Sequence, residues 1–245
     1  MKPSLGETRT VIAARHALIA PDGHVPSPLP DFHAAIPFVL IAPPLSFSLA
    51  QIMIRFSEGG RAAFPADADE TALYVQSGSC TVTIGADCHG LDGGGFAFSP
   101  AGQQLTINSS DAVVTCFRKK YHPLGEIPPV VVGNAADVVP VAFLGNPQTM
   151  LKTLLPDDLR FDMAMNVFTF EPGAGLPFVE THVMEHGLLM LSGKGIYQLD
   201  SARYAVAADD IIWMAPWCPQ WFRAEGDQPA SYLYYKDINR HPVLK

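Results

Sequence analysis

Residues 180–186 read ETHVMEH and place a carboxylate and two imidazoles, Glu180, His182 and His186, at positions i, i+2 and i+6. The stretch lies between residues 173–175 (GAG) and 193–195 (GKG), and glycines disfavour a helix there. Side chains two apart in a strand share a face, so Glu180 and His182 can point inward together, and His186 can join them. The spacing predicts a metal site within a β-hairpin.

Two other interpretations of these residues remain open. The helical zinc motif, with histidines at i and i+4, also matches His182 and His186, although Gly187 and the flanking strand-like runs disfavour a helix. The second alternative is a pair of buried or surface histidines that bind no metal. That alternative is the usual one for a lone histidine, whereas a cluster within one glycine-bounded hairpin favours a metal.

The rest of the chain has the pattern of a β protein. Short runs rich in Val, Ile, Phe, Tyr and Thr alternate with Gly, Pro, Asp and Asn, and a sustained helical period is almost absent. The 22 prolines and 20 glycines punctuate loops and strand ends. Evenly spaced short strands with turn signals predict an all-β sandwich or barrel. The runs are residues 72–76, 80–84, 95–99, 113–117, 167–170, 188–191, 211–215 and 231–236.

Three blocks of sequence recur in the same order at a shift of about 115 residues. Any two β domains share alternating apolar patterns, which would explain one block but not the common order and spacing. We therefore predict two tandem β lobes, residues 1–130 and 131–245, joined through the proline-rich stretch 122–149. The aligned pairs are residues 47–60 with 161–174, 70–79 with 185–194, and 96–104 with 212–220.

Composition argues against several classes of protein. The chain has 245 residues, of which 48% are hydrophobic, enough for a substantial core. Its net charge of −8 argues against nucleic acids and anionic membranes as partners, and we expect the short basic run at residues 118–120 to be a solvated strand end. Neither a membrane span nor a signal peptide is evident, so we expect a soluble, cytoplasmic protein. The four cysteines show no CxxC pairing, which predicts reduced thiols.

Two motifs resemble those of cupins. The cluster at residues 180–186, followed by Gly193, resembles the first cupin motif, and Pro216, Cys218 and Gln220 resemble the second. Most cupins use two histidines, a glutamate and a third histidine as ligands. Here a glutamate comes first and a glutamine last, a pattern that is similar to bicupins of the (S)-ureidoglycine aminohydrolase family. The likeness covers nearly the whole chain, including residues 16–30, 155–175 and 231–240.

The resemblance implies two tandem cupin (jelly-roll) β-barrels and a metal-dependent hydrolase. Its reaction would convert (S)-ureidoglycine and water to (S)-ureidoglycolate and ammonia in purine and allantoin degradation. The C-terminal lobe would carry the site. The implied metal ligands are Glu180, His182, His186 and Gln220, and the implied catalytic, substrate-facing residues are Tyr197, Tyr232 and Lys236, with Glu180 able to combine ligation and proton transfer. Taken singly, the tyrosines could be packing residues and the lysine a strand-end side chain.

The predicted ligand set also bears on the metal and on the first lobe. Two imidazoles, a carboxylate and an amide oxygen suit Mn²⁺ or Fe²⁺, and the resemblance implies Mn²⁺ in preference to Fe²⁺. In the repeat alignment, Pro65, Asp67 and Thr71 stand opposite the first three ligands and Gln104 stands opposite the fourth. These side chains are too few and too weak as ligands, so we expect the first lobe to be a metal-free scaffold.

Two other functional classes remain open. A different metal-dependent bicupin enzyme, such as a dioxygenase or isomerase, should carry the common histidine-rich ligand set, which this chain lacks. A non-enzymatic bicupin that binds small molecules would need no open metal position. As partners we expect a small-molecule ureide substrate and further copies of the chain, because exposed strand edges favour pairing.

Overall fold

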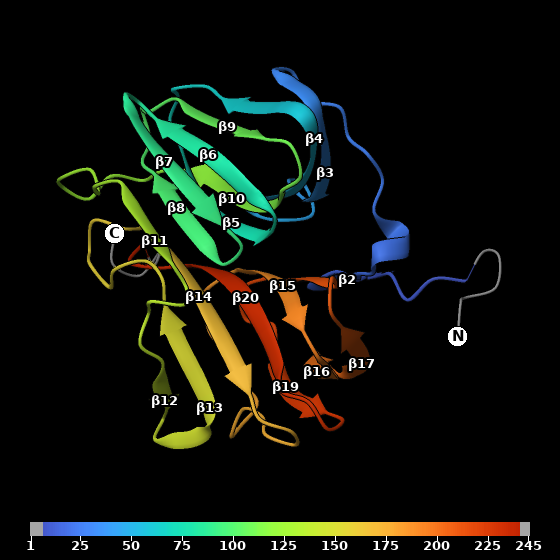
Figure 1. Cartoon of the computed structure of the whole chain (residues 1–245). Helices are drawn as coiled ribbons and strands as arrows, with labels where there is room; N and C mark the ends of the chain where they lie inside the picture. Colours follow the sequence, from blue (N-terminus) through green and yellow to red (C-terminus); the bar gives the residue numbers. More distant parts are fainter. Residues whose placement is uncertain (1–6, 241–245) are drawn as a thin grey trace. The chain divides into compact units, whose positions relative to one another are not determined.

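The computed structural model describes residues 7–240 and consists almost entirely of β-strands (Figure 1). The helical element among the described residues is one 3₁₀ turn, η1 (Pro21–Gly23). The strands confirm the predicted all-β class, and all four cysteines are free thiols. Within residues 7–240, no helix has the length and apolar character that a membrane crossing requires.

The chain divides into two compact units, neither of which is continuous in sequence. The C-terminal lobe contains the described residues up to His24 together with residues 140–152 and 166–237. The N-terminal lobe contains residues 25–139 and 153–165 and the described residues from Ile238 onward. The duplication predicted continuous lobes, whereas here the beginning of the chain contributes strands to the sheet of the later lobe.

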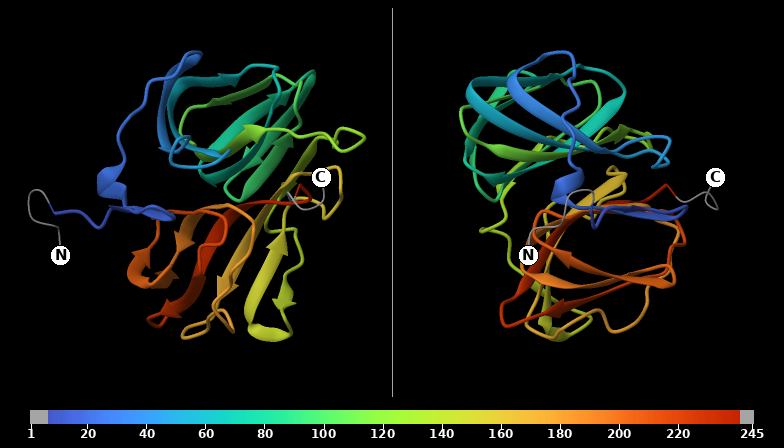
Figure 2. Two further views of the ribbon diagram at one scale, coloured as in Figure 1. Left: turned by 180° about the vertical axis from the view of Figure 1, so that it is seen from behind. Right: turned by 90° about the vertical axis from the view of Figure 1, so that its right-hand side faces the viewer.

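The C-terminal lobe is built on two sheets whose strands surround an interior (Figure 2). The larger sheet has the order β1-β2-β18-β15-β20-β14-β13-β12, and the smaller has the order β17-β16-β19. Their bounds are β1 (Val11–Ile12), β2 (His16–Ile19), β12 (Val141–Phe143), β13 (Asn146–Thr153), β14 (Met163–Phe170), β15 (His186–Ser192), β16 (Lys194–Leu199), β17 (Ala202–Ala207), β18 (Ile211–Met214), β19 (Gln220–Glu225) and β20 (Ala230–Asp237).

The N-terminal lobe is one nine-stranded sheet with the order β11-β8-β5-β10-β4-β9-β6-β7, and β3 pairs with β4. The bounds are β3 (Phe32–Ile41), β4 (Ala50–Phe64), β5 (Asp69–Ser77), β6 (Ser79–Ile84), β7 (Asp87–Asp92), β8 (Gly95–Ser99), β9 (Leu105–Ser109), β10 (Val113–Lys120) and β11 (Val131–Asn134).

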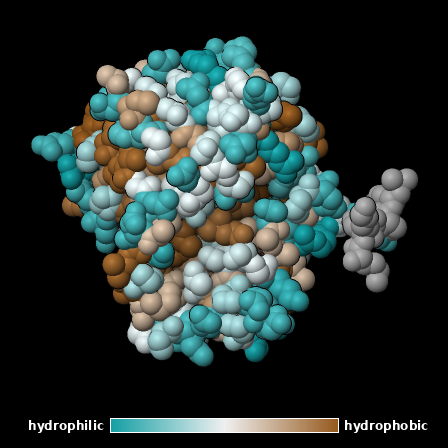
Figure 3. Space-filling view, viewed as in Figure 1, coloured by the Kyte–Doolittle hydropathy of each residue, from teal (hydrophilic) through white to brown (hydrophobic). Residues whose placement is uncertain are grey.

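The interiors of the two lobes differ in chemistry. The buried cluster of the N-terminal lobe is mostly aliphatic and includes Val82, Val114 and Cys116. The corresponding cluster of the C-terminal lobe contains tyrosines such as Tyr197 and Tyr232. Apolar residues also reach the surface, where Figure 3 shows brown residues among teal ones. The hydroxyl groups of these tyrosines give the aromatic cluster of the C-terminal lobe polar atoms that the aliphatic cluster lacks.

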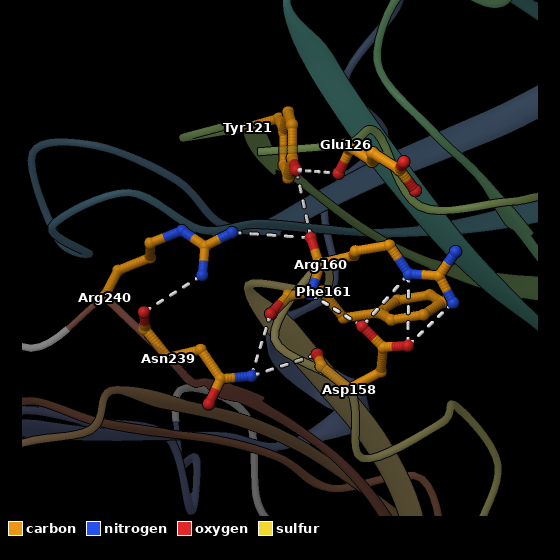
Figure 4. Close-up of polar contacts among 7 residues, drawn as sticks. All are labelled: Tyr121, Glu126, Asp158, Arg160, Phe161, Asn239 and Arg240. Carbon is orange, nitrogen blue, oxygen red and sulfur yellow. Dashed lines mark hydrogen bonds and ion pairs between the residues drawn. The ribbon is translucent and has the colours of Figure 1, made fainter. Parts of the chain in front are cut away.

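Backbone carbonyls in residues 158–161 anchor this loop within the N-terminal lobe (Figure 4). Asn239 Nδ2 donates hydrogen bonds to the carbonyl oxygens of Asp158 and Phe161 at 3.1 and 3.0 Å. The Tyr121 hydroxyl donates to the carbonyl of Arg160 at 3.0 Å. These bonds satisfy carbonyl groups that an irregular loop would otherwise leave unpaired.

The N-terminal lobe also contains a cluster of buried charged groups. Lys119 Nζ lies 2.8 Å from Asp162 Oδ2, with both side chains almost fully buried, and the His122 N–H donates to the same oxygen at 2.8 Å. Glu70 stands opposite Lys119 in the β5–β10 pairing and shares a hydrogen bond with the Asp162 carboxyl group. The expectation of a solvated basic run was therefore wrong for Lys119 and holds for the exposed Lys120.

Candidate active site

A cavity of about 240 Å³ opens in the C-terminal lobe. Strands β15, β16, β19 and β20 contribute side chains to its wall, together with the segment that precedes β15. The structure brings every residue of the predicted site to this cavity. These residues are Glu180, His182, His186, Tyr197, Gln220, Tyr232 and Lys236.

Backbone pairing positions the predicted metal ligands. His186 begins β15, and Gln220 begins β19. Glu180 and Gln220 form an isolated antiparallel bridge, with N–H···O distances of 2.8 and 2.9 Å. The carbonyl of His182 accepts a hydrogen bond from the Trp217 N–H at 2.7 Å. Glu180 and His182 thus lie in an irregular segment tied to the β18–β19 turn, whereas the spacing alone predicted a hairpin strand.

Three side chains of the predicted ligand set meet directly. His182 Nε2 lies 3.0 Å from His186 Nε2 and 2.9 Å from Gln220 Nε2. The carboxylate of Glu180 lines the same cavity. Within residues 7–240, however, no three His, Cys, Asp or Glu side chains are close enough to form a metal site on their own. Joint ligation by all four residues therefore stays a prediction.

The side chains that meet have donor chemistry suited to a divalent ion. Burial lowers the pKa of His182, and burial followed by the proximity of His182 lowers that of His186 well below its usual range, so both rings stay neutral and keep a lone pair. A half-turn of the Gln220 amide would present its oxygen to His182 and an N–H to the Tyr197 hydroxyl. Two neutral imidazoles and an amide oxygen fit Mn²⁺ or Fe²⁺.

The other predicted residues surround this group. Tyr197 is fully buried, and its hydroxyl donates to Gln220 Oε1 at 3.2 Å. After the half-turn the same hydroxyl would accept from Gln220 Nε2, so it supports the amide in either orientation. Burial also raises the pKa of Tyr232, which keeps its phenol protonated. Lys236 stands directly opposite His186 in the β15–β20 pairing. Burial raises the pKa of Glu180, and the positive charge of Lys236 opposes that shift.

Sequence reasoning missed three aromatic residues of the cavity wall: Tyr234, Phe143 and Phe168. Tyr234 could have been found, because it lies between Tyr232 and Lys236 at the two-residue spacing that defines one face of a strand. Phe143 belongs to the short β12–β13 hairpin, and no signal in the sequence places that hairpin at the site.

The N-terminal lobe fills the corresponding position with an arginine. Arg118 stands opposite Thr71, just as Lys236 stands opposite His186. Its guanidinium donates to Thr71 Oγ1 at 3.0 Å and to both oxygens of Asp67 at 2.7 Å. The guanidinium of Arg118 thus binds Asp67 and Thr71, the two side chains that stand opposite His182 and His186 in the repeat alignment, and a metal-free first lobe stays a prediction.

The structure corrects one detail of the repeat alignment. Gln220 pairs with Leu199, the sixth residue after Gly193, and Leu105 pairs with Ile84, the sixth residue after Gly78. Leu105 therefore stands in the position of Gln220, one residue beyond the predicted Gln104. The first lobe has an apolar side chain where the second has an amide.

Comparisons with known proteins agree with this architecture. The Cupin domain family model matches residues 166–235. The (S)-ureidoglycine aminohydrolase of Arabidopsis thaliana is 33% identical over 240 residues, 97% of this chain and 80% of the relative. The (S)-ureidoglycine aminohydrolase of Escherichia coli (strain K12) is 34% identical over 231 residues, 91% of this chain and 88% of the relative. The crystal structure of protein Ylba from E. coli has a TM-score of 0.86 and 32% identity, with 96% of each chain covered.

The two-lobed all-β fold and a cavity lined by histidines in one lobe define a bicupin enzyme. With about a third of its residues identical to curated relatives over nearly its whole length, the chain belongs to the (S)-ureidoglycine aminohydrolase family. The resemblance drawn from the ligand pattern is confirmed.

Proposed function

We propose that this chain hydrolyses (S)-ureidoglycine to (S)-ureidoglycolate and ammonia as a step of purine and allantoin degradation. The observation that carries the proposal is that His182 Nε2 lies 3.0 Å from His186 Nε2 and 2.9 Å from Gln220 Nε2, in a cavity that Lys236 also lines. Curated relatives that align with nearly the whole chain bear the name of this activity. Glu180 would complete the Mn²⁺ ligand set.

The cavity supplies binding groups for each part of the substrate. When bound, Mn²⁺ supplies a Lewis acid and a template for two substrate heteroatoms. Among the described residues, Lys236 is the only lysine or arginine that lines the cavity, so the substrate carboxylate binds against it. Tyr232, a protonated phenol in the same wall, donates a hydrogen bond to a substrate oxygen.

The reaction exchanges an amino group for a hydroxyl group on one carbon. The carbon–nitrogen bond to the amine breaks, and the amine leaves as ammonia after it takes up a proton. A carbon–oxygen bond to water forms, and the water gives up a proton. Lys236 is the candidate donor to the leaving amine, while Glu180, the one carboxyl group lining the cavity among the described residues, can pass protons during the exchange. Atoms and charge balance over the two steps.

The test compares ammonia release from freshly generated (S)-ureidoglycine with bound Mn²⁺ in the same samples. In His182→Ala we expect both to fall together, because one imidazole of the ligand set is lost, while circular dichroism shows an intact fold. His33→Ala, which removes an exposed histidine of the N-terminal lobe, is the matched control and should change neither. Metal content that is unchanged in His182→Ala would refute the site.

A further inference from the structure

Tyr234 lies between two predicted site residues and has no role in the proposed reaction. It shares one face of β20 with Tyr232 and Lys236, and all three line the cavity. Its ring stacks on Phe168, with centroids 5.6 Å apart and an interplanar angle of 17°. Its centroid lies 5.7 Å from that of His186. The phenol is therefore built into the wall beside the predicted metal position.

A buried asparagine fixes the hydrogen bonding of this phenol. Asn166, on the neighbouring strand β14, donates from Nδ2 to the Tyr234 hydroxyl oxygen at 3.0 Å. Among residues 7–240, the Asn166 Oδ1 atom has no hydrogen-bond partner. A half-turn of the amide would replace this unpaired carbonyl with an additional unpaired N–H, and buried N–H groups are left unpaired less often than buried carbonyls. Because the hydroxyl accepts from Asn166, its own proton remains available to a ligand.

The surroundings of Tyr234 select the kind of group that its proton can reach. The wall beside it is apolar and aromatic, formed by Phe143, Phe168 and Leu188. Lys236 stands two residues further along the strand, about 7 Å away, and attracts the carboxylate. A neutral, planar group with a carbonyl acceptor suits the position of Tyr234 better than a second charge, because an apolar wall penalises unpaired charge.

We propose that Tyr234, oriented by Asn166, donates a hydrogen bond to the ureido carbonyl oxygen of the substrate and thereby selects ureido compounds. This inference rests on the proposed function and names the contact that recognises the planar end of its substrate.

Calorimetric titration of the manganese-loaded protein with two stable ligands tests this contact. N-carbamoylglycine carries the ureido carbonyl, whereas guanidinoacetate has a nitrogen in place of that oxygen. In Tyr234→Phe we expect N-carbamoylglycine to bind about tenfold more weakly, the effect of one neutral hydrogen bond, and guanidinoacetate to bind as in the wild type. Tyr235→Phe removes a phenol from the opposite face of β20 and should leave both affinities unchanged.

A second variant separates positioning from packing. In Asn166→Asp, a carboxylate would accept the Tyr234 proton and turn it away from the ligand, so the same tenfold loss should appear with the ring still in place. The variant that combines Asn166→Asp with Tyr234→Phe should bind N-carbamoylglycine no more weakly than Tyr234→Phe alone, because both changes remove the same interaction. Equal weakening of both ligands in Tyr234→Phe would indicate packing and overturn the inference.

The two proposals fail in different ways. Ammonia release by the wild type, together with unchanged N-carbamoylglycine binding in Tyr234→Phe, would overturn the Tyr234 contact and leave the proposed function standing. The opposite outcome is also distinct. If Tyr234→Phe weakens the binding of N-carbamoylglycine alone, and the wild type releases no ammonia, the contact is supported and the proposed reaction is overturned.

Discussion

Replacing Glu70 by glutamine tests the buried acid pair of the N-terminal lobe. Burial, and next the hydrogen bond to Asp162, raises the pKa of Glu70 from its ordinary 4.5 to about 10. Between these two values the folded chain holds a proton that the unfolded chain has lost. The contribution of Glu70 to the free energy of unfolding is therefore fully present below the pKa of the unfolded chain. It is lost as the pH rises toward the pKa of the folded chain, at about 1.4 kcal/mol per pH unit.

Glu70→Gln removes this titration and keeps an N–H donor for Asp162. Burial alone would raise the pKa of Asp162, but the hydrogen bond from Glu70 and the charge of Lys119 outweigh it and lower the pKa. The contribution of Asp162 to the free energy of unfolding is thus present above the ordinary pKa of an aspartate and is constant from pH 5 to 9. We expect the variant to match the wild type near pH 5 and to exceed its free energy of unfolding by about 4 kcal/mol at pH 8.

Urea unfolding followed by far-ultraviolet circular dichroism, at pH 5, 6, 7 and 8, measures this difference. Circular dichroism is preferable to tryptophan fluorescence because all three tryptophans, at positions 213, 217 and 221, lie in the C-terminal lobe. The exposed Glu58→Gln is the matched control and should follow the wild type at every pH. Parallel pH profiles for wild type and Glu70→Gln would refute the buried proton.

Two further predictions concern the metal. Tyr197→Phe removes the hydroxyl that holds the Gln220 amide, so we expect Mn²⁺ affinity, measured by competition with a chelator, to fall about tenfold while the fold persists; unchanged affinity would mean that Gln220 needs no such support. The double variant Asp67→Ala with Gln104→Ala should keep about one metal ion per chain, the count that one four-ligand site supports, and nearly unchanged turnover. Two tightly bound ions per chain in the wild type would contradict a single site.

The alternation of apolar residues and the turn signals were enough to predict most of the strands. The predicted run 95–99 coincides with β8, and residues 231–236 fall within β20. The common order and spacing of three sequence blocks allowed the duplication to be recognised. The alignment still slipped by one residue at Leu105, because a proline- and glycine-rich turn carries no periodicity that would fix the register.

The candidate site was predictable where local spacing determines geometry and was missed where long-range pairing does. His186, at the start of a strand, follows the expected pattern, but His182 is placed by a backbone hydrogen bond from Trp217, far along the chain. Lys119 looked like a solvated strand end, because its buried partner Asp162 lies in a distant loop. Such contacts depend on tertiary packing, which no short window of sequence encodes.

The configuration of the product tests the central claim most directly. Freshly generated (S)-ureidoglycine is incubated with the manganese-loaded protein, and the released ammonia and the two enantiomers of ureidoglycolate are measured over time. A substrate held between the metal site and Lys236 presents one face to water, so the account predicts accelerated ammonia release and (S)-ureidoglycolate as the single enantiomer. Ammonia release at the uncatalysed rate with racemic product would contradict it.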